Sequence, residues 1–308
     1  MIASFLTVAQ QVLILFALMA VGFVLGKTRL MDDRGSLAMT HLVMYAVSPA
    51  MMVVAFQRDK SGAEIHNFLL CLLLAVAVHA VAIALSYVCL RGKDSACGIL
   101  RFATVFSNCG FMGYPLMISL LGSIGVFYGS AYVVVFTVLS WTAGVYMITR
   151  DRSKLRLRAV LINPGVLSVA VAMVLYLLAV RLPDIVMTPL NHLANMNTPL
   201  PTIVVGYQLS HAELRTAFSD RRSWGVLGLR LVVVPLLTLG LCWVLRVDSA
   251  VALVTVIAAS TPPAALLSMF TQKFGGDTRL SASVVSVFTA LSVLTIPLVV
   301  GLAKFLMG

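Results

Sequence analysis

Long apolar stretches, separated by short polar segments, run along the whole chain. An α-helix needs about 20 such residues to cross the hydrocarbon core of a bilayer, and most of these stretches reach that length. The pattern therefore predicts an all-α integral membrane protein with ten transmembrane helices. We expect them at residues 5–25, 36–56, 66–90, 98–121, 126–149, 160–181, 187–209, 223–245, 249–270 and 281–303.

Lysine and arginine are distributed unequally between the connecting loops. The odd-numbered loops hold sixteen of them and the even-numbered loops hold four. Positive residues accumulate on the cytoplasmic side of membrane proteins, so we expect the odd loops to be cytoplasmic. With ten spans, both termini then face outward. The predicted location is the plasma membrane, which in bacteria is the inner membrane.

The composition leaves no room for a soluble domain. Hydrophobic residues make up 60% of the 308 positions and the mean hydropathy is +1.02, whereas soluble domains are about 45–50% apolar. The net charge of +11 does not indicate nucleic-acid binding, because the basic residues lie between apolar stretches. The first stretch has no basic leader, so we expect a retained helix rather than a cleaved signal peptide. The five cysteines form no metal-binding or disulfide spacing.

Two halves of the chain resemble each other. The segment VFTVLS at 135–140 matches VFTALS at 287–292, and SAYVV at 130–134 matches SASVV at 281–285. Five spans are an odd number, so the second half enters the membrane in the opposite sense, an arrangement typical of secondary transporters. Chance similarity between small-residue helices is the alternative. The expected units are a first five-helix repeat, a basic cytoplasmic linker and a second, inverted five-helix repeat at residues 1–149, 150–159 and 160–308.

The fourth and ninth spans carry helix breakers near their middles. Glycine and proline interrupt a helix, and the backbone groups that they free inside a bilayer have to be satisfied by protein or by a wet cavity. Two breaks at matching positions favour a substrate site over simple kinks. We expect the cavity to be lined by Asn108, Cys109, Gly110, Tyr114 and Pro115 from the fourth span, with Ser107 and Gly113 nearby, and by Ser260, Thr261, Pro262 and Pro263 from the ninth.

The helical segments after Pro115 and Pro263 are expected to start there and to turn their positive ends toward this cavity. Each helix end stabilises an anion by about 0.3–1 kcal/mol, and by up to about 2 kcal/mol when it is partly buried. Two converging ends can therefore hold a carboxylate without a buried Arg or Lys. The second and seventh spans also carry proline beside polar residues, and either line the same cavity or only kink there: Ser48, Pro49, Asn197, Thr198 and Thr202.

Few titratable residues lie within the apolar spans. None of them contains Asp or Glu at depth, so the acidic pair of a sodium or proton antiporter is absent. His79 could carry a coupling proton, or could be a neutral imidazole bonded to a neighbouring helix. Arg230 either snorkels to the membrane surface or attracts an anionic substrate. The pair Gly22 and Gly26 indicates close helix packing.

Several segments resemble the auxin efflux carrier family, which includes PIN-like carriers and bacterial malate/malonate-type permeases. They are FSNCGFMGYPL in the fourth span, TPLPTIVVGYQLS in the seventh, TPPAALLSMF in the ninth and GGDTRLSASVVSVFTALSVLTIPL before and in the tenth. The resemblance covers essentially the whole chain.

The resemblance implies two inverted five-helix repeats in a fold related to bile-acid and sodium/proton antiporters. It implies that helices four and nine cross at their breaks, within a moving domain next to a scaffold domain, and that the protein is a homodimer. By the same resemblance, Asn108 would hydrogen-bond a carboxylate and Pro262–Pro263 would mark the opposite break. Ser260 and Thr261 stand where plant members tend to have Asn, and the long central loop is missing. The resemblance therefore does not extend to auxin as the substrate.

The predicted function is that of a secondary active transporter or facilitator. It would move a small organic anion, a mono- or dicarboxylate, by alternating access around the crossing of helices four and nine. No cofactor or metal and no enzymatic activity are expected, and coupling to protons or sodium is left open. A membrane sensor on a transporter fold and a channel are the alternatives.

Overall fold

The computed structural model describes residues 2–155, 157–211 and 213–307, and within these ranges the chain is helical with no strand. The first half begins with one continuous helix. Its elements are α1 (Ile2–Lys27), α2 (Asp33–Leu42), η1 (Val43–Val47), α3 (Ser48–Phe56), α4 (Gly62–Cys89), α5 (Ser95–Val105), η2 (Cys109–Gly113), α6 (Tyr114–Leu121), α7 (Ser123–Leu139), η3 (Ser140–Gly144) and α8 (Val145–Thr149).

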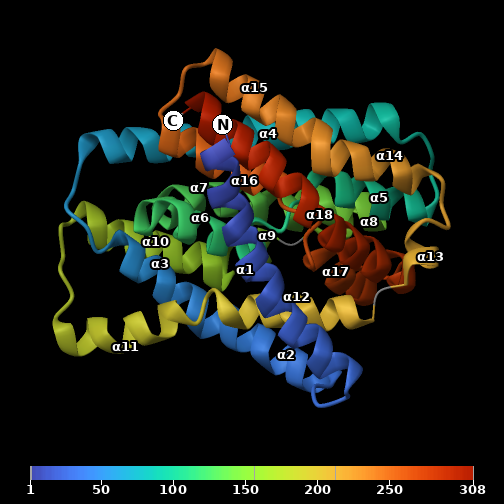
Figure 1. Ribbon diagram of the computed structural model, residues 1–308, viewed down its shortest axis with the longest axis horizontal. Coiled ribbons are helices and arrows are strands. Elements are labelled where there is room, and N and C mark those ends of the chain that lie inside the picture. Colours follow the sequence, from blue (N-terminus) through green and yellow to red (C-terminus); the bar gives the residue numbers. More distant parts are fainter. Residues whose placement is uncertain (1, 156, 212, 308) are drawn as a thin grey trace.

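A short 3₁₀ turn, η4 (Arg152–Lys154), connects the two halves. The second half ends with one continuous helix. Its elements are α9 (Leu157–Leu161), α10 (Pro164–Leu177), α11 (Asp184–Asn195), α12 (Pro199–Ser210), α13 (Leu214–Ala217), α14 (Arg222–Gly228), η5 (Leu229–Val233), α15 (Val234–Val244), α16 (Ser249–Ser260), α17 (Leu266–Phe274) and α18 (Thr278–Met307). The two ends of the chain lie close together in Figure 1, where the start of α1 packs against α18.

Six helices of the described residues are long and apolar enough to cross a membrane: Phe5–Lys27, Asp33–Phe56, Gly62–Cys89, Ser123–Thr149, Arg222–Val244 and Thr278–Met307. They match six of the ten expected spans. The expected fourth, sixth and ninth spans contain shorter apolar helices, and the expected seventh span is divided between α11 and α12. The count of ten spans and the inverted repeat stay predictions.

Some helices begin with an N-cap residue whose side chain accepts a hydrogen bond from the first turn. The carboxylate of Asp94 accepts a hydrogen bond from the Cys97 amide at 3.2 Å, and that of Asp248 accepts one from the Ala250 amide at 2.9 Å. A capped first turn satisfies backbone donors that have no partner within the helix. These two caps fix the starts of α5 and α16, the helices that run into the two breaks.

Helix α1 packs along α12 at very short range. A β-carbon at Gly22 would lie 2.0 Å from the carbonyl oxygen of Ile203, and one at Gly206 would lie 2.0 Å from that of Met19. Only glycine allows the two backbones to approach this closely, so the packing interpretation of Gly22 is confirmed.

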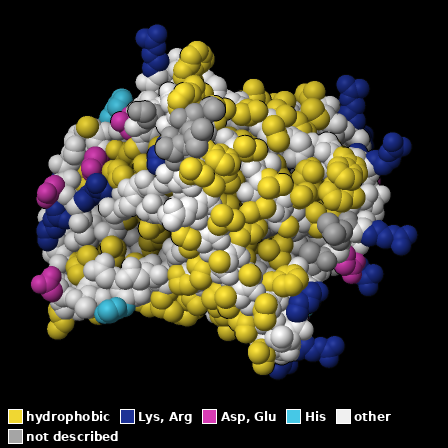
Figure 2. All heavy atoms as spheres, in the orientation of Figure 1, with side chains coloured by type: hydrophobic (Ala, Val, Ile, Leu, Met, Phe, Trp, Pro, Cys, Tyr) yellow, Lys and Arg dark blue, Asp and Glu magenta, His cyan; other side chains and the backbone are white. Residues whose placement is uncertain are grey.

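The surface agrees with a protein that sits in a bilayer. Apolar side chains cover the middle of the molecule in Figure 2, and charged side chains gather toward its ends. Most of the lysine and arginine on this face lies toward one end, where the loops after α1, α4 and α17 are found in Figure 1. We refer to this end as the basic side.

Candidate functional site: a cavity at the crossing of two broken helices

The two helix breaks meet and pair through their backbones. The amide of Asn108 donates to the Pro262 carbonyl at 2.7 Å, and the amide of Ala264 donates to the Phe106 carbonyl at 2.9 Å. Ser107 and Pro263 form an antiparallel bridge between these bonds. Each extended segment thus satisfies backbone groups that the other leaves free, as burial in an apolar medium requires.

The half-helices start at other residues than the sequence suggested. The segment on the far side of the first break starts at Cys109 rather than after Pro115, because the side chain of Asn108 accepts a hydrogen bond from the Phe111 amide at 3.3 Å. Pro115 lies inside this continuous helical segment, directly after the π-helical turn η2, and does not mark its start. On the other side, α17 starts at Leu266, three residues beyond Pro263.

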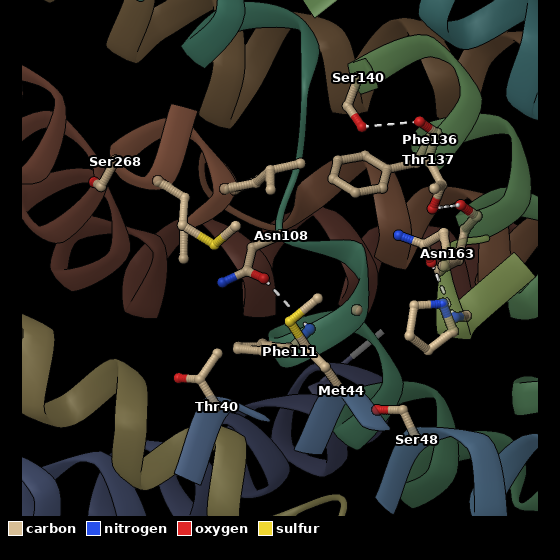
Figure 3. A pocket seen from close by; sticks show the side chains of 18 of the residues that line it. Thr40, Met44, Ser48, Asn108, Phe111, Phe136, Thr137, Ser140, Asn163 and Ser268 are labelled. Carbon is tan, nitrogen blue, oxygen red and sulfur yellow. Dashed lines mark hydrogen bonds between the residues drawn. The ribbon is translucent and has the colours of Figure 1, made fainter. Parts of the chain in front are cut away.

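A cavity of about 550 Å³ lies against the crossing. Asn108 stands in the middle of the labelled ring of Figure 3, with residues of α2 and α3 on one side and residues of α7 and η3 on the other. The cavity also reaches the first residues of α2 and α10 and the last turn of α17. These elements adjoin the loops of the basic side, so the cavity extends from the crossing toward that side.

Four of the residues predicted for the site line this cavity: Ser48, Asn108, Gly110 and Tyr114. Ser107, named as their neighbour, lines it too. Asn108 is 6% exposed, and its amide nitrogen Nδ2 has no hydrogen-bond partner among the described residues. The hydroxyl of Ser107 is likewise without a partner there. Buried polar groups in native proteins are nearly always paired, so two unpaired groups beside a cavity indicate a place for a ligand.

The ninth span lines the cavity with residues after its break, not with the four that we predict. Ser260 donates to the Val256 carbonyl at 2.7 Å and Thr261 donates to the Ala258 carbonyl at 3.0 Å, so both hydroxyls are bonded to their own helix. Pro262 and Pro263 are buried in the extended link. None of the four residues lines the cavity, and the same holds for the buried Cys109 and Pro115 of the fourth span.

The residues predicted from the seventh span lie behind the lining of the cavity. Asn197 accepts a hydrogen bond from Ser48 at 3.0 Å, which holds the cavity-lining Ser48 against the connection between α11 and α12. Thr202 donates to the Thr198 carbonyl at 2.6 Å within that segment. These three residues and Pro49, in the first turn of α3, lie outside the lining.

Several lining residues escaped the sequence reasoning. Phe136, Thr137 and Ser140 belong to the segment VFTVLS, which we had used only as evidence for a repeat. The recurrence of this segment at 287–292 is the feature of the sequence that could have pointed to these residues. Others lie within the segments quoted for the repeat or the family resemblance: Phe111, Val133, Tyr207, Gln208, Ala264, Ala265, Leu266, Ser268 and Met269. The remaining ones have no signal along the chain and come together only in the fold: Asp33, Ser36, Leu37, Thr40, Met44, Met52, Trp141, Asn163, Pro164, Gly165 and Gln272.

The cavity carries little fixed charge. Among the described residues no lysine, arginine or histidine lines it, and Asp33 is the only carboxylate that does. The Asp33 carboxylate accepts a hydrogen bond from the Tyr207 hydroxyl at 2.8 Å. Backbone dipoles, such as that of the helix that begins at Cys109, are therefore the positive groups that remain among the described lining residues.

His79 and Arg230 both lie outside the lining. The ring of His79 is fully buried, and its Nδ1 lies 2.8 Å from the Ala75 carbonyl of its own helix. A bond to a neighbouring helix is therefore not what holds it. Arg230 is 1% exposed and points into the protein. The snorkelling interpretation is thus wrong, because the guanidinium finds its hydrogen bonds inside the bundle rather than at the membrane surface.

Aromatic side chains fill the space on the side opposite the basic loops. The rings of Phe56 and Phe127 have centroids 4.5 Å apart, and the ring of Tyr176 lies 5.1 Å from that of Phe127. An ion pair between Arg58 and Glu64, at 3.0 Å, lies next to this cluster. None of these three rings lines the cavity, which instead reaches elements next to the loops of the basic side.

The sequence matches a known protein family along most of its length. A family described as membrane transport protein matches residues 7–159 and 149–300. The chain belongs to this family. The resemblance to the auxin efflux carriers, which rests on segments of the fourth, seventh, ninth and tenth spans, is thereby confirmed.

Two archaeal relatives align over nearly their whole length. An uncharacterized transporter of Methanothermobacter thermautotrophicus is 26% identical over 302 residues, which cover 96% of this chain and 98% of the relative. An uncharacterized transporter of Methanocaldococcus jannaschii is 23% identical over 300 residues, covering 93% and 96%. Membership in a membrane transporter family, together with the apolar helices, makes this a multi-pass membrane protein.

Proposed function

We propose that this member of the membrane transport protein family is a secondary transporter or facilitator for a small organic anion. Transport would proceed by alternating access, with the substrate held beside the crossing of the broken helices. The observation that carries the proposal is the unpaired amide nitrogen of Asn108 at the wall of a cavity, next to the start of a half-helix.

The cavity geometry favours a carrier over a channel. A continuous pore needs an opening on both sides, and the rings of Phe56, Phe127 and Tyr176 pack together on the side opposite the basic loops. The described residues that line the cavity include no ring of like charges and no run of carbonyls of the kind that selects ions in channels. The described conformation corresponds to the state that is open toward the basic side, which the distribution of Lys and Arg predicts to be the cytoplasm.

The charge of the lining favours a monocarboxylate over a dicarboxylate. A carboxylate can accept from Asn108 and face the positive helix end. A second carboxylate would find no cation among the described lining residues and would meet Asp33 at the approach. Apolar walls that include Phe111, Phe136 and Trp141 fit a substrate with an apolar body.

Reconstitution into liposomes tests this proposal. Phenylacetate serves as the monocarboxylate probe, phenylacetamide as its neutral counterpart and succinate as the dicarboxylate. We expect saturable uptake of labelled phenylacetate, accelerated by unlabelled phenylacetate on the other side of the membrane, with weak competition from the other two compounds. Binding without flux would support a sensor instead, and non-saturating flux at rates far above about 10³ per second would support a channel.

The proposal also includes the oligomeric state, the membrane, the orientation and the coupling of transport. A homodimer in the plasma membrane with both termini outside is consistent with the family and with the basic-loop distribution. His79 stays a prediction for proton coupling, and uptake measured at two pH values in its Gln variant tests it. A pH dependence that is identical in parent and variant would exclude the residue.

A further inference from the structure

Arg230 lies outside the cavity lining, and it contacts both broken helices. Its Nη1 donates to the carbonyls of Thr104 at 3.2 Å and Val105 at 3.3 Å, in the last turn of α5. Its Nε donates to the Thr261 carbonyl at 3.2 Å, and Nη2 donates to the Ala259 carbonyl, at the end of α16. One side chain thus binds the C-terminal ends of two helices from different halves of the chain.

These carbonyls are groups that a helix cannot satisfy by itself. The last four carbonyls of an α-helix have no partner within it, and together they carry about half a negative charge. In water they would be hydrated, but α5 and α16 end inside the bundle. The planar fork of an arginine offers five donors, which suits several carbonyls at once better than the point charge of a lysine does.

The charge of Arg230 has no carboxylate partner among the ion pairs of the described residues. A buried charge without compensation is very costly, so the compensation has to come from the two helix ends. Two ends of about half a negative charge each match one guanidinium. The helices that follow the two breaks begin at Cys109 and Leu266, and no such side chain among the described residues cancels the partial positive charge of their N-terminal ends.

The backbone around Arg230 is adapted to this contact. Arg230 lies in η5, a π-helical turn between α14 and α15. Such an insertion rotates a residue out of the regular helical register and is frequently found at functional sites.

We infer that Arg230 is a positioning residue, which fixes the two half-helices at their crossing and cancels their negative ends. The cavity at Asn108 is thereby left with a net positive potential that selects an anion without any cation in the lining. This inference rests on the proposed function for its effect on anions, whereas the effect on the crossing is independent of any substrate.

Hydrogen–deuterium exchange tests the positioning role without a ligand. In Arg230→Met, we expect faster exchange in peptides that cover 103–110 and 260–267, because the Asn108 and Ala264 amides would lose their fixed acceptors. Peptides of α1 and α4 should exchange as in the parent. Arg246→Met is the matched control, since Arg246 is an exposed arginine just beyond the end of the same span. Unchanged exchange at both breaks in Arg230→Met would overturn the inference.

Binding tests the electrostatic role. We expect Arg230→Met to bind phenylacetate about tenfold more weakly, the size of effect that a partly buried helix end produces. Phenylacetamide should bind with an affinity close to that of the parent. An equal loss for both compounds would show a purely structural role and contradict the charge cancellation.

Arg230→Lys keeps the charge but not the fork, so it remains informative if the methionine variant fails to fold. We expect it to exchange faster at the breaks and to keep the parent's ratio of phenylacetate to phenylacetamide affinity. If Arg230→Lys prefers phenylacetate over phenylacetamide as weakly as Arg230→Met does, the inference is contradicted. If the parent binds no carboxylate although exchange changes as expected, the proposed function fails and the positioning role stands.

Discussion

The two helix breaks have similar backbones and unequal chemistry. At the first break, Asn108 caps a half-helix with its oxygen and leaves its nitrogen unpaired beside the cavity. At the second, the hydroxyls of Ser260 and Thr261 bond back to their own helix. The second break therefore supplies shape and backbone hydrogen bonds, whereas the first supplies the polar contact. A repeated backbone geometry does not require a repeated side-chain function.

Replacing Asn108 should have the largest effect. Asn108→Asp keeps the capping oxygen but puts a negative charge where the substrate carboxylate is proposed to bind, so we expect phenylacetate binding to be abolished. Asn108→Ala removes the donor and also the cap, which is worth about 1 kcal/mol of stability. Isothermal titration with phenylacetate and a thermal melt separate the two effects. Binding by Asn108→Asp as tight as in the parent would remove the first break from the site.

Asp33 lies on the approach to the first break and should discriminate by charge. Two unit charges about 10 Å apart at an effective dielectric near 40 repel by about 0.8 kcal/mol, a factor of about four. Asp33→Asn should therefore improve succinate binding about fourfold while changing phenylacetamide binding little. Competition assays with both compounds measure this difference. No gain for succinate would mean that the approach does not sense substrate charge.

The start of α5, the helix that leads into the first break, should respond to pH. Arg222 donates to both carboxylate oxygens of Asp94, at 2.9 and 2.6 Å, and holds the pKa of that carboxyl well below its usual range. Because the pKa is lowered in the folded state, the stabilisation is present above the ordinary pKa of about 4 and is lost as the pH falls below it.

Asp94→Asn keeps a capping side chain but loses this ion pair. We expect its melting temperature to change less between pH 7 and pH 3 than that of the parent. Asp220 also pairs with Arg222 and has a lowered pKa, so Asp94→Asn should reduce the slope rather than remove it. Arg222→Met breaks both pairs and should flatten the pH dependence further, and the double variant should behave like Arg222→Met.

The smallest effect is expected at the second break itself. Ser260→Ala and Thr261→Val each remove one hydrogen bond within a helix, which is worth about 0.5–1.5 kcal/mol. Phenylacetate affinity should stay within about twofold of the parent in both, as titration can measure. A loss of phenylacetate affinity as large as that of Asn108→Ala would show that both breaks contact the substrate through their side chains.

The sequence by itself determined that the chain is a helical membrane protein broken at two places, and it pointed to Asn108, Gly110 and Tyr114. Apolar length, proline and glycine are local signals, because the bilayer and the backbone act on each segment separately. The family segments added the crossing, which the structure places where the breaks pair.

Only the tertiary structure decided which polar residues face the cavity and which bond to their own helix. Asp33, Trp141 and Gln272 come from distant segments and line one cavity only because the bundle brings them together. Ser260 and Thr261 look like site residues in the sequence, yet their hydroxyls have acceptors one turn away. The role of Arg230 was equally hidden, since the ends of α5 and α16 lie next to one another only after the chain has folded.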